Sequence, residues 1–389
     1  MEKIKIGDAC DLLNGYSFKS DQYVDSGIRV IRIANVQKGY IEDNSPVFYP
    51  LDSEGLDKYM LEEEDLLISL TGNVGRVALL QKDMLPAALN QRVACLRLKT
   101  DRITKGFLFH ILNSDFFEQQ CILASNGVAQ KNMNTEWLKD YEVPLYSISE
   151  QLKITEILDK TRKIIEARNK ELVNLDSLIK ARFVEFFGDT VINPKGWTEH
   201  RLDEYITFLT SGSRGWAQYF TDEKNELFIT IKNVKNNHII LGDIQYVDAP
   251  ENKEAERTKV KTGDLLISIT ADLGRTGVVD DSIADRGAYI NQHLSLVRLD
   301  RDKINPLYVS YFLETSGGKR QFESKNQNGV KAGLNFEAIK SLKILVPPIE
   351  MQKQYIDFVK QVDKSKVAVQ KALDETQTLF DSLMQEYFG

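Results

Sequence analysis

The chain has 389 residues, of which 42% are hydrophobic, and this is enough for two or three domains with cores of their own. A formal net charge of −7 counts against binding nucleic acid through a uniformly basic surface, so any such binding must use local patches. Three scattered cysteines, Cys10, Cys95 and Cys121, fit neither a disulfide framework nor a zinc site and are expected to be buried, reduced thiols. Without a secretory segment near residue 1 or an apolar run of ~20 residues, the sequence predicts a cytoplasmic protein with no membrane contact.

The sequence repeats itself at an offset of about half its length. Residues 65–76 (DLLISLTGNVGR) match residues 264–275 (DLLISITADLGR), and residues 90–98 match residues 291–299. This period is far longer than the roughly 20–50 residues of a solenoid repeat, so each copy is predicted to be a whole domain plus a connector. A protein built from two similar modules usually has two similar binding sites.

The first part of each copy is predicted to be an α+β domain with a twisted, partly closed sheet. Short β-like runs are separated by Gly, Asn and Asp, as tight turns require, and a helical stretch follows them. The two domains are placed at residues 1–147 and 189–347. The strand candidates are 30–33, 65–70 and 93–98 in the first copy and 228–231, 264–269 and 294–299 in the second, and the helical stretches are 106–120 and 306–322.

A long helix is predicted at the end of each copy, over residues 148–188 and 348–389. Apolar residues recur there at heptad spacing, and two such seams in one chain most simply pack on each other. The alternative is that the apolar seams leave room for a helix of a partner to pack there. The residues predicted to pair the helices are Ile154, Leu158, Ile165, Leu172 and Ile179 in the first helix and Val359, Val362, Leu373 and Phe380 in the second.

Catalytic motifs are missing from the sequence. It contains no GxxxxGK[ST] phosphate loop, no glycine motif for a dinucleotide or methyl donor, and no clustered His and Cys for a metal. Asn193-Pro194-Lys195-Gly196-Trp197 lacks the second proline and adjacent aromatic residue of an amino-group methylation motif. The acidic run Glu62–Asp65 is expected to be a solvated turn before a strand. The chain is therefore predicted not to be an enzyme.

Polar loops next to the predicted strands are the candidate binding residues. Asn and Gln can read adenine bidentately and Arg can read guanine, while Lys and Arg can contact phosphate. The alternatives are ordinary turns, amides that cap the backbone, solvated loops and aromatic core packing, and the shared Asn35 and Asn233 are expected to be structural. The candidates in the first copy are Lys19, Arg32, Asn73, Arg76, Asn90, Gln91, Arg92, Gln130, Lys131 and Asn132. Those in the second copy are Arg214, Lys232, Lys235, Arg275, Asn291, Gln292, His293, Lys325, Asn326, Gln327 and Lys331.

Over its whole length the chain resembles the specificity subunit of type I restriction–modification systems. The order and duplication of several weak motifs carry this resemblance. They are the domain–helix repeat, the glycine loops at 71–76 and 270–275, the segments 126–145 and 328–348 that lead into the helices, the Glu150-Gln151 helix start and the junction at 186–197. The second copy departs where Ala271 and Asp272 replace Gly72 and Asn73, and where Met351 separates Glu350 from Gln352.

The resemblance implies that each domain is a target-recognition domain reading one half of a bipartite, asymmetric site in double-stranded DNA. The helices would form an antiparallel coiled coil that sets the spacing and docks two methyltransferase (modification) subunits. S-adenosylmethionine would bind to those subunits, and ATP and Mg to partner subunits that include the restriction/translocase subunits, with no cofactor on this chain. The alternative is a non-catalytic protein-interaction scaffold of two β-rich domains on a coiled coil.

Overall fold

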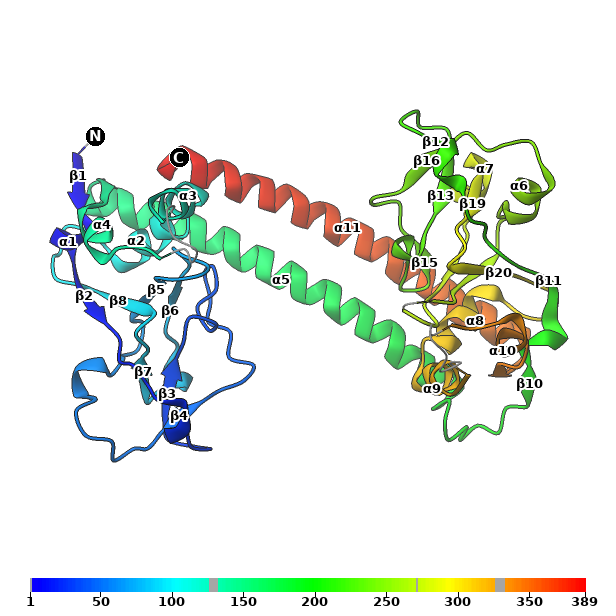
Figure 1. Cartoon of the computed structure of the whole chain (residues 1–389), viewed down its shortest axis with the longest axis horizontal. Helices are drawn as coiled ribbons and strands as arrows, with labels where there is room; N and C mark the ends of the chain where they lie inside the picture. Colours follow the sequence, from blue (N-terminus) through cyan, green and yellow to red (C-terminus); the bar gives the residue numbers. More distant parts are fainter. Residues whose placement is uncertain (1, 126–131, 271, 326–332) are drawn as a thin grey trace. The chain divides into compact units, whose positions relative to one another are not determined.

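The computed structural model describes residues 2–125, 132–270, 272–325 and 333–389, and it divides into two compact units. Unit 1 comprises Met1–Lys170 with Gln370–Gly389, and unit 2 comprises Glu171–Val369. Each unit is thus a globular domain with segments of both long helices, α5 (Ile148–Phe187) and α11 (Ile349–Phe388), which Figure 1 draws in full. The predicted α+β class and the two long helices are confirmed, while the four domain boundaries stay a prediction.

The globular part of unit 1 is built from short strands and short helices. The strands are β1 (Glu2–Lys5), β2 (Cys10–Asn14), β3 (Ile28–Ile31), β4 (Phe48–Tyr49), β5 (Leu66–Ser69), β6 (Val77–Leu79), β7 (Ala87–Leu89), β8 (Val93–Leu98) and β9 (Glu142–Leu145). The helices are α1 (Ile6–Ala9), α2 (Lys105–Leu112), α3 (Asp115–Ala124) and α4 (Thr135–Asp140).

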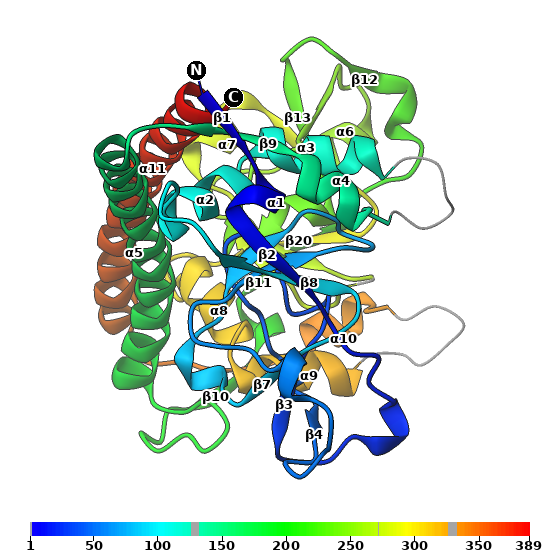
Figure 2. The ribbon, with the colours of Figure 1, turned by 90° about the vertical axis from the view of Figure 1, so that its left-hand side faces the viewer.

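Two sheets lie at the centre of this domain. The larger is antiparallel with the strand order β2-β8-β5-β6, and the smaller has the order β4-β3-β7, with β3 and β7 parallel. Strands β1 and β9 form a separate pair. Figure 2 shows α2, α3 and α4 on one side of the larger sheet and β3, β4 and β7 on the other. The larger sheet is therefore covered on both faces.

Unit 2 has corresponding elements in the same order. The strands are β10 (Glu199–Arg201), β11 (Ile206–Ser211), β12 (Phe220–Thr221), β13 (Glu226–Ile229), β14 (Val234–Lys235), β15 (His238–Ile239), β16 (Gln245–Val247), β17 (Leu265–Ser268), β18 (Thr276–Val278), β19 (Ala288–Ile290), β20 (Leu294–Leu299) and β21 (Lys343–Leu345). The helices are α6 (Lys253–Thr258), α7 (Asp281–Arg286), α8 (Pro306–Leu313), α9 (Ser316–Lys325) and α10 (Phe336–Lys340). The sheets follow the orders β11-β20-β17-β18, β12-β16-β13-β19, β10-β21 and β14-β15.

The repeated DLLIS strands are apolar throughout because both of their faces are buried. Successive side chains of a strand point to opposite faces. Leu66 and Ile68 belong to the core that contains α2 and α3, whereas Leu67 belongs to a second core beneath the smaller sheet. In unit 2, residues 265 and 267 lie in one core and residue 266 in another. A strand buried on both faces reads as a continuous apolar run rather than an alternating one.

Two sequence-based boundaries were wrong. The strand predicted at 30–33 ends at Ile31, because the side chain of Asn35 accepts the backbone N–H of Arg32 at 2.8 Å and folds the chain into a turn. Asn233 accepts the N–H of Thr230 at 2.9 Å, and the strand of unit 2 ends at Ile229. Both asparagines are buried, which confirms their structural role.

The helical stretches 106–120 and 306–322 are each interrupted. In the first, α2 ends at Leu112, and the side chain of Ser114 accepts the N–H of Phe117 at 3.2 Å to begin α3. In the second, α8 ends at Leu313, and Thr315 accepts the N–H of Gly318 at 3.4 Å. Each break places a hydroxyl residue where a helix N-cap needs an acceptor.

The prediction that the acidic run before β5 is a solvated turn was wrong for its last residue. Glu62, Glu63 and Glu64 are exposed, but Asp65 is buried. Its carboxylate accepts two bonds from Arg97, at 2.9 and 2.7 Å, and one from the N–H of Glu62 at 2.7 Å. A buried carboxylate needs such partners. Unit 2 has the same arrangement, in which Asp264 binds Arg298 at 2.7 and 2.6 Å.

Segments of the two long helices share a core within each unit. In unit 1, Ile154 and Leu158 of α5 are buried in the same hydrophobic cluster as the end of α11. Phe380 of α11 is partly buried and packs against this cluster. In unit 2, Ile179 of α5 shares a cluster with Val359 and Val362 of α11. Of the remaining pairing candidates, Leu373 is buried, and Ile165 and Leu172 are half-buried.

Within the described part of the chain, no helix is both long enough and apolar enough to span a bilayer. The three cysteines are unpaired and buried, as predicted. Burial raises the pKa of Cys10 and of Cys121 to about 12, so these thiols stay protonated at neutral pH.

Candidate nucleic-acid interface

The glycine loop after β5 is closed by hydrogen bonds that do not use its variable side chains. The Ser69 hydroxyl donates to the backbone carbonyl of Asn73 and accepts the N–H of Arg76 at 3.0 Å. In unit 2, the Ser268 hydroxyl donates to the carbonyl of Asp272 and accepts the N–H of Arg275 at 2.9 Å. Because position 73 or 272 contributes only its main chain, its exposed side chain is free to differ between the units.

Three segments singled out in the sequence of the first copy meet at the end of β5. The N–H of Leu70 donates to the carbonyl of Arg92 at 3.0 Å, and the carbonyl of Leu70 accepts the N–H of Met133 at 2.8 Å. One backbone residue thus joins the glycine loop, the Asn-Gln-Arg segment and the segment next to Asn132. Asn132 itself bridges to Thr71 and is exposed.

Unit 2 brings the corresponding segments together in the same way. The N–H of Ile269 donates to the carbonyl of His293 at 3.0 Å, and the carbonyl of Ile269 accepts the N–H of Leu334 at 3.0 Å. The repeated pattern means that, in each unit, backbone hydrogen bonds bring these polar loops together at the end of the central strand.

The loop near the start of each copy joins this surface through close backbone contact. The N–H of Gln91 donates to the carbonyl of Tyr16 at 2.9 Å. A Cβ added at Gly15 would lie 2.2 Å from the backbone of Asn90, and one at Gly212 would lie 2.0 Å from the carbonyl oxygen of Asn291. Only glycine permits this approach.

The candidate amides divide into two kinds. The side chains of Asn90 and Asn291 cap their own turns, accepting the N–H of residue 92 at 3.3 Å and of residue 293 at 3.1 Å. Gln91 and Arg92 are exposed beside the first turn. In unit 2, His293 lies between Thr270 at 2.7 Å and Gln292 at 3.1 Å, so its orientation is fixed on both ring nitrogens.

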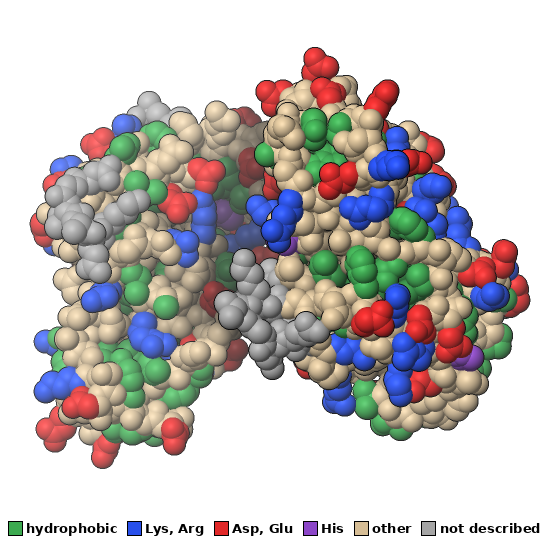
Figure 3. Space-filling view, turned by 45° about the vertical axis from the view of Figure 1, so that its right-hand side comes forward, with side chains coloured by type: hydrophobic (Ala, Val, Ile, Leu, Met, Phe, Trp, Pro, Cys, Tyr) green, Lys and Arg blue, Asp and Glu red, His purple; other side chains and the backbone are tan. Residues whose placement is uncertain are grey.

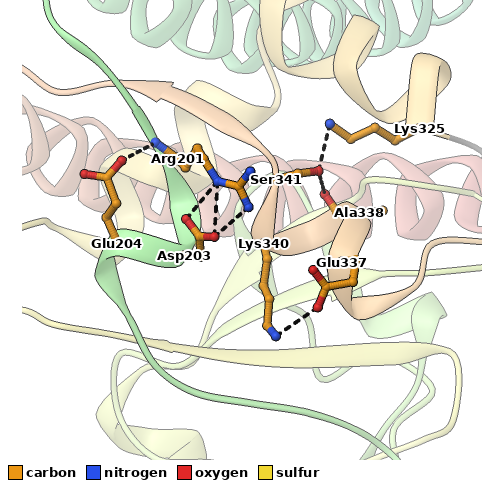
Figure 4. A network of polar contacts seen from close by, with 8 residues as sticks. All are labelled: Arg201, Asp203, Glu204, Lys325, Glu337, Ala338, Lys340 and Ser341. Atoms are coloured by element: carbon orange, nitrogen blue, oxygen red, sulfur yellow. Dashed lines mark hydrogen bonds and ion pairs between the residues drawn. The ribbon is translucent and has the colours of Figure 1, made fainter.

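Several candidate cations are already engaged within the protein. Arg76 donates to the Gln37 side chain, and Arg32 donates to the carbonyl of Ser45 at 2.8 Å. Arg275 pairs with Asp272 at 2.7 Å across an exposed turn. Lys325 donates to the hydroxyl of Ser341 at 2.8 Å, in a network where Arg201 pairs with Asp203 and Lys340 with Glu337 (Figure 4).

Other candidate cations are exposed without an ion pair among the residues that the structure describes. These are Lys19, Arg92, Arg214, Lys232 and Lys235. The aromatic residues beside two of them pack inward: Phe18 packs partly buried against a core cluster, and Trp216 is buried. The candidates Gln130, Lys131, Asn326, Gln327 and Lys331 lie outside the described residues.

Sequence reasoning missed Lys319 and the hollow that it borders. This hollow of about 470 Å³ in unit 2 is also lined by Lys235, Arg275 and Glu314. The aligned position in the first copy is Glu118, so a position-by-position comparison of the copies would have pointed to Lys319 as a difference in charge.

On the face of unit 2 that Figure 3 shows, the charges are mixed rather than gathered into one basic patch. Figure 3 shows Lys and Arg side chains interspersed with Asp and Glu on the side of the unit turned toward the viewer. No group of three or more His, Cys, Asp or Glu in the described ranges is placed to hold a metal ion. The surface offers amides, guanidinium groups and ammonium groups, which can hydrogen-bond to base edges and phosphates.

Comparison with known proteins places these features in a family. A family model described as the type I restriction modification DNA specificity domain matches residues 1–175 and 194–376. The type I restriction enzyme EcoBI specificity subunit of Escherichia coli is 22% identical over 416 residues, which cover 99% of this chain and 85% of the relative. The EcoAI specificity subunit of Escherichia coli is 33% identical over 175 residues, which cover 43% of this chain and 29% of the relative.

Solved structures show the same fold. The S subunit of a type I restriction–modification system from M. genitalium has a TM-score of 0.62 at 15% identity, covering 100% of this chain and 96% of that one. A chain from a structure of type I R-M complex assembly has a TM-score of 0.57 at 19% identity, covering 100% and 97%. The family model matches both halves and most of the residues, so this chain belongs to the type I restriction–modification DNA specificity family, as the sequence resemblance predicted.

Proposed function

We propose that this chain supplies the DNA sequence specificity of a type I restriction–modification complex, with each globular domain reading one half of a bipartite, asymmetric site. The observation that carries this proposal is the convergence at Leu70 and Ile269, where hydrogen bonds of one backbone residue hold the polar loops of its unit together. The loops share their backbone closure but differ in exposed side chains, such as Asn73 against Asp272. Two surfaces that share a backbone arrangement but carry different side chains can recognise two different half-sites.

We further propose that the chain arose by duplication and that α5 and α11 pair as an antiparallel coiled coil. Support comes from the order of the central strands, which is β2-β8-β5-β6 in one unit and β11-β20-β17-β18 in the other. In unit 1 the first turns of α5 share a core with the last turns of α11, and in unit 2 the last turns of α5 share one with the first turns of α11. Helices that pair in this way run in opposite directions.

The paired helices are proposed to set the gap between the half-sites and to dock two modification subunits. Those partners would carry S-adenosylmethionine and the adenine methylation chemistry, and restriction subunits would carry ATP and Mg. This chain would then bind none of these cofactors and catalyse no reaction itself. The net charge of −7 supports this division of roles, because a protein that is not basic overall would gain DNA affinity from its partners.

A domain exchange tests this function. Residues 1–147 would be replaced by the corresponding domain of a family member with a different recognition sequence, and the chain would be expressed with its modification subunits. Sequencing of adenine methylation across the genome should show one altered half-site and one unchanged. A change in both half-sites would contradict independent reading by the two domains.

A DNA shift assay separates this function from a scaffold without base reading. The chain would be assayed alone and with co-expressed modification subunits, on a duplex carrying the methylated sequence and on a scrambled duplex. Selective binding by the complex supports the proposal. Equal binding to both duplexes would favour the scaffold.

A further inference from the structure

The hairpin formed by β14 and β15 in unit 2 lies beside the glycine loop. Its two-residue turn, Asn236-Asn237, has positive φ at both positions, +50° and +67°, as tight hairpins favour. Lys235 and Asn236 line the same hollow of about 470 Å³ as Gly274 and Arg275 of the glycine loop. The hairpin therefore forms one wall of the hollow next to that loop.

The turn of this hairpin is fixed to the globular part of unit 2. Asn237 is buried, and its side-chain oxygen accepts a hydrogen bond from the Ser310 hydroxyl of α8 at 2.9 Å. The backbone carbonyl of Asn237 accepts the N–H of Val278 in β18 at 3.0 Å. A Cβ added at Gly277 would lie 2.8 Å from the carbonyl oxygen of His238, so the hairpin packs directly on β18.

A second contact joins the same hairpin to a long helix. Nε2 of His238 lies 3.3 Å from Oδ2 of Asp363 in α11, and the two side chains are 43% and 27% exposed. Lys366, one turn further along α11, lies 2.6 Å from Asp176 of α5 and 3.7 Å from Asp363. Because Lys366 is held mainly by Asp176, the carboxylate of Asp363 is left to His238. The hairpin thus connects the glycine loop to the helix segments of unit 2.

The aligned positions of unit 1 carry residues that do not make this contact. Tyr40 stands at the position of His238, and Arg162 at the position of Asp363. The guanidinium group of Arg162 lies over the ring of Phe109, 5.0 Å from its centroid. The pair between hairpin and long helix in unit 2 therefore has no counterpart at these two positions.

The corresponding turn of unit 1 is held by a short helix instead. Lys38, which aligns with Asn236, pairs with Asp115 and Glu118 of α3, the latter at 2.8 Å. The two units thus anchor the same turn to different elements. A displacement of the long helix would act directly on the hairpin of unit 2 through His238.

We propose that His238 and Asp363 are positioning residues that couple the helices of unit 2 to base selectivity at the half-site of that unit, and that Tyr40 and Arg162 do not do so in unit 1. The inference rests on the proposed reading of a bipartite site and adds a route by which the helices regulate one reader. A hairpin fixed to both its domain and α11 must follow the helix or lose one contact, and either outcome alters the wall beside the glycine loop.

A double-mutant cycle on selectivity tests this coupling in the complex with modification subunits. Dissociation constants would be measured for the methylated sequence and for two duplexes with one base pair changed in either half-site, which the exchange of residues 1–147 assigns to their domains. Asp363→Ala and His238→Ala should each lower discrimination at the half-site of unit 2 by about two- to five-fold, the size expected for a partly exposed pair. The double variant should lose no more than either single variant, because both remove one interaction.

The matched control is Asp357→Ala, which removes an exposed carboxylate from the same helix and should change discrimination at neither half-site. Asp363→Glu keeps the carboxylate and should retain the wild-type discrimination. Thermal unfolding of each variant verifies that the fold is intact.

Three outcomes would overturn the coupling: unchanged discrimination in both single variants, additive losses in the double variant, or equal losses at the two half-sites. The last of these is what a merely structural role would produce. Failure of the wild-type complex to prefer its own sequence would instead contradict the proposed function, so the two failures are distinct.

Discussion

Asp65 and Asp264 are acidic residues whose role is to hold the domain together rather than to contact a ligand. Each forms a two-point ion pair with an arginine of the adjacent strand, Arg97 or Arg298. The bonds to Asp65 are the main cause that raises the pKa of Arg97. Loss of one partner would leave a buried, unpaired charge, which typically costs about 3–5 kcal/mol. Repetition of a polar residue in both copies is therefore compatible with a purely structural role.

The residue types of the candidate surface could be predicted from the sequence, but their partners could not. Asn, Gln and Arg beside a strand end indicated hydrogen-bonding loops, and the structure gathers them at Leu70 and Ile269. That Arg76 contacts Gln37 depends on how two loops 39 residues apart fold together. The turn-capping roles of Asn90 and Asn291 were among the alternatives that the sequence left open.

Gly274 allows a prediction at the residue scale. Its φ is +79°, and an added Cβ would meet the ring of Phe322 at 2.2 Å. Gly274→Ala should therefore lower the free energy of unfolding by about 1–2 kcal/mol for the left-handed backbone and by about 1–3 kcal/mol more for crowding. Thermal unfolding measures the effect.

The matched control is Gly215→Ala. Gly215 has a φ of +80°, but an added Cβ would meet nothing within 4 Å. This variant should carry only the backbone cost. Equal destabilisation by the two substitutions would show that contact with Phe322 contributes nothing.

At the scale of elements, a buried glutamine connects each long helix to its domain. Gln151 of α5 accepts the N–H of Thr104 at 2.8 Å and donates to the carbonyls of Arg102 and Tyr146. Gln352 of α11 accepts the N–H of Asn305 at 2.9 Å and donates to the carbonyl of Pro347 at 2.8 Å. Gln151 of the Glu150-Gln151 helix start and its counterpart Gln352 thus tie the long helices to the domains through hydrogen bonds.

Gln352→Ala should destabilise unit 2 by about 1–3 kcal/mol, because it leaves the partly buried N–H of Asn305 without an acceptor. Hydrogen exchange should show reduced protection at the Asn305 amide in particular. Gln354→Ala, at an exposed position of the same helix, is the control and should change neither quantity. An Asn305 amide that keeps full protection in Gln352→Ala would contradict the assigned role.

Long elements were predictable from the sequence and short ones were not. The heptad pattern over many turns places α5 and α11 within a residue or two of their observed ends. The breaks at Ser114 and Thr315 were missed because one hydroxyl residue, rather than a Gly or Pro, marks them. The end of β3 was missed because the side chain of Asn35 competes with the strand for the N–H of Arg32.

At the scale of the whole molecule, the sequence repeat indicated two domains and two helices, but it did not show how the helices are shared. Unit 1 takes its helical segments from residues before Lys170 and after Gln370, and unit 2 takes the segments between them. A linear sequence cannot show this division, because it depends on which end of one helix meets which end of the other. The clusters around Leu158 and Ile179 reveal it.

A paired insertion tests the proposed spacer role of these helices. Seven residues would be added after Lys170 in α5 and seven after Val369 in α11, which lie at the divisions between the units. Seven residues keep the heptad seam in register and lengthen each helix by about 10 Å at 1.5 Å per residue. Because B-DNA rises about 3.4 Å per base pair, methylome sequencing should show both half-sites unchanged and a gap longer by up to about three base pairs.

The control is the same insertion in α5 alone, which leaves the helices unequal in length and should abolish methylation. An unchanged gap with altered half-sites in the paired variant would contradict the spacer proposal, because the helices would then affect base reading rather than distance. An unchanged gap with unchanged half-sites would also contradict it. A longer gap with intact half-sites is the result expected if distance is set by the helices and sequence by the domains.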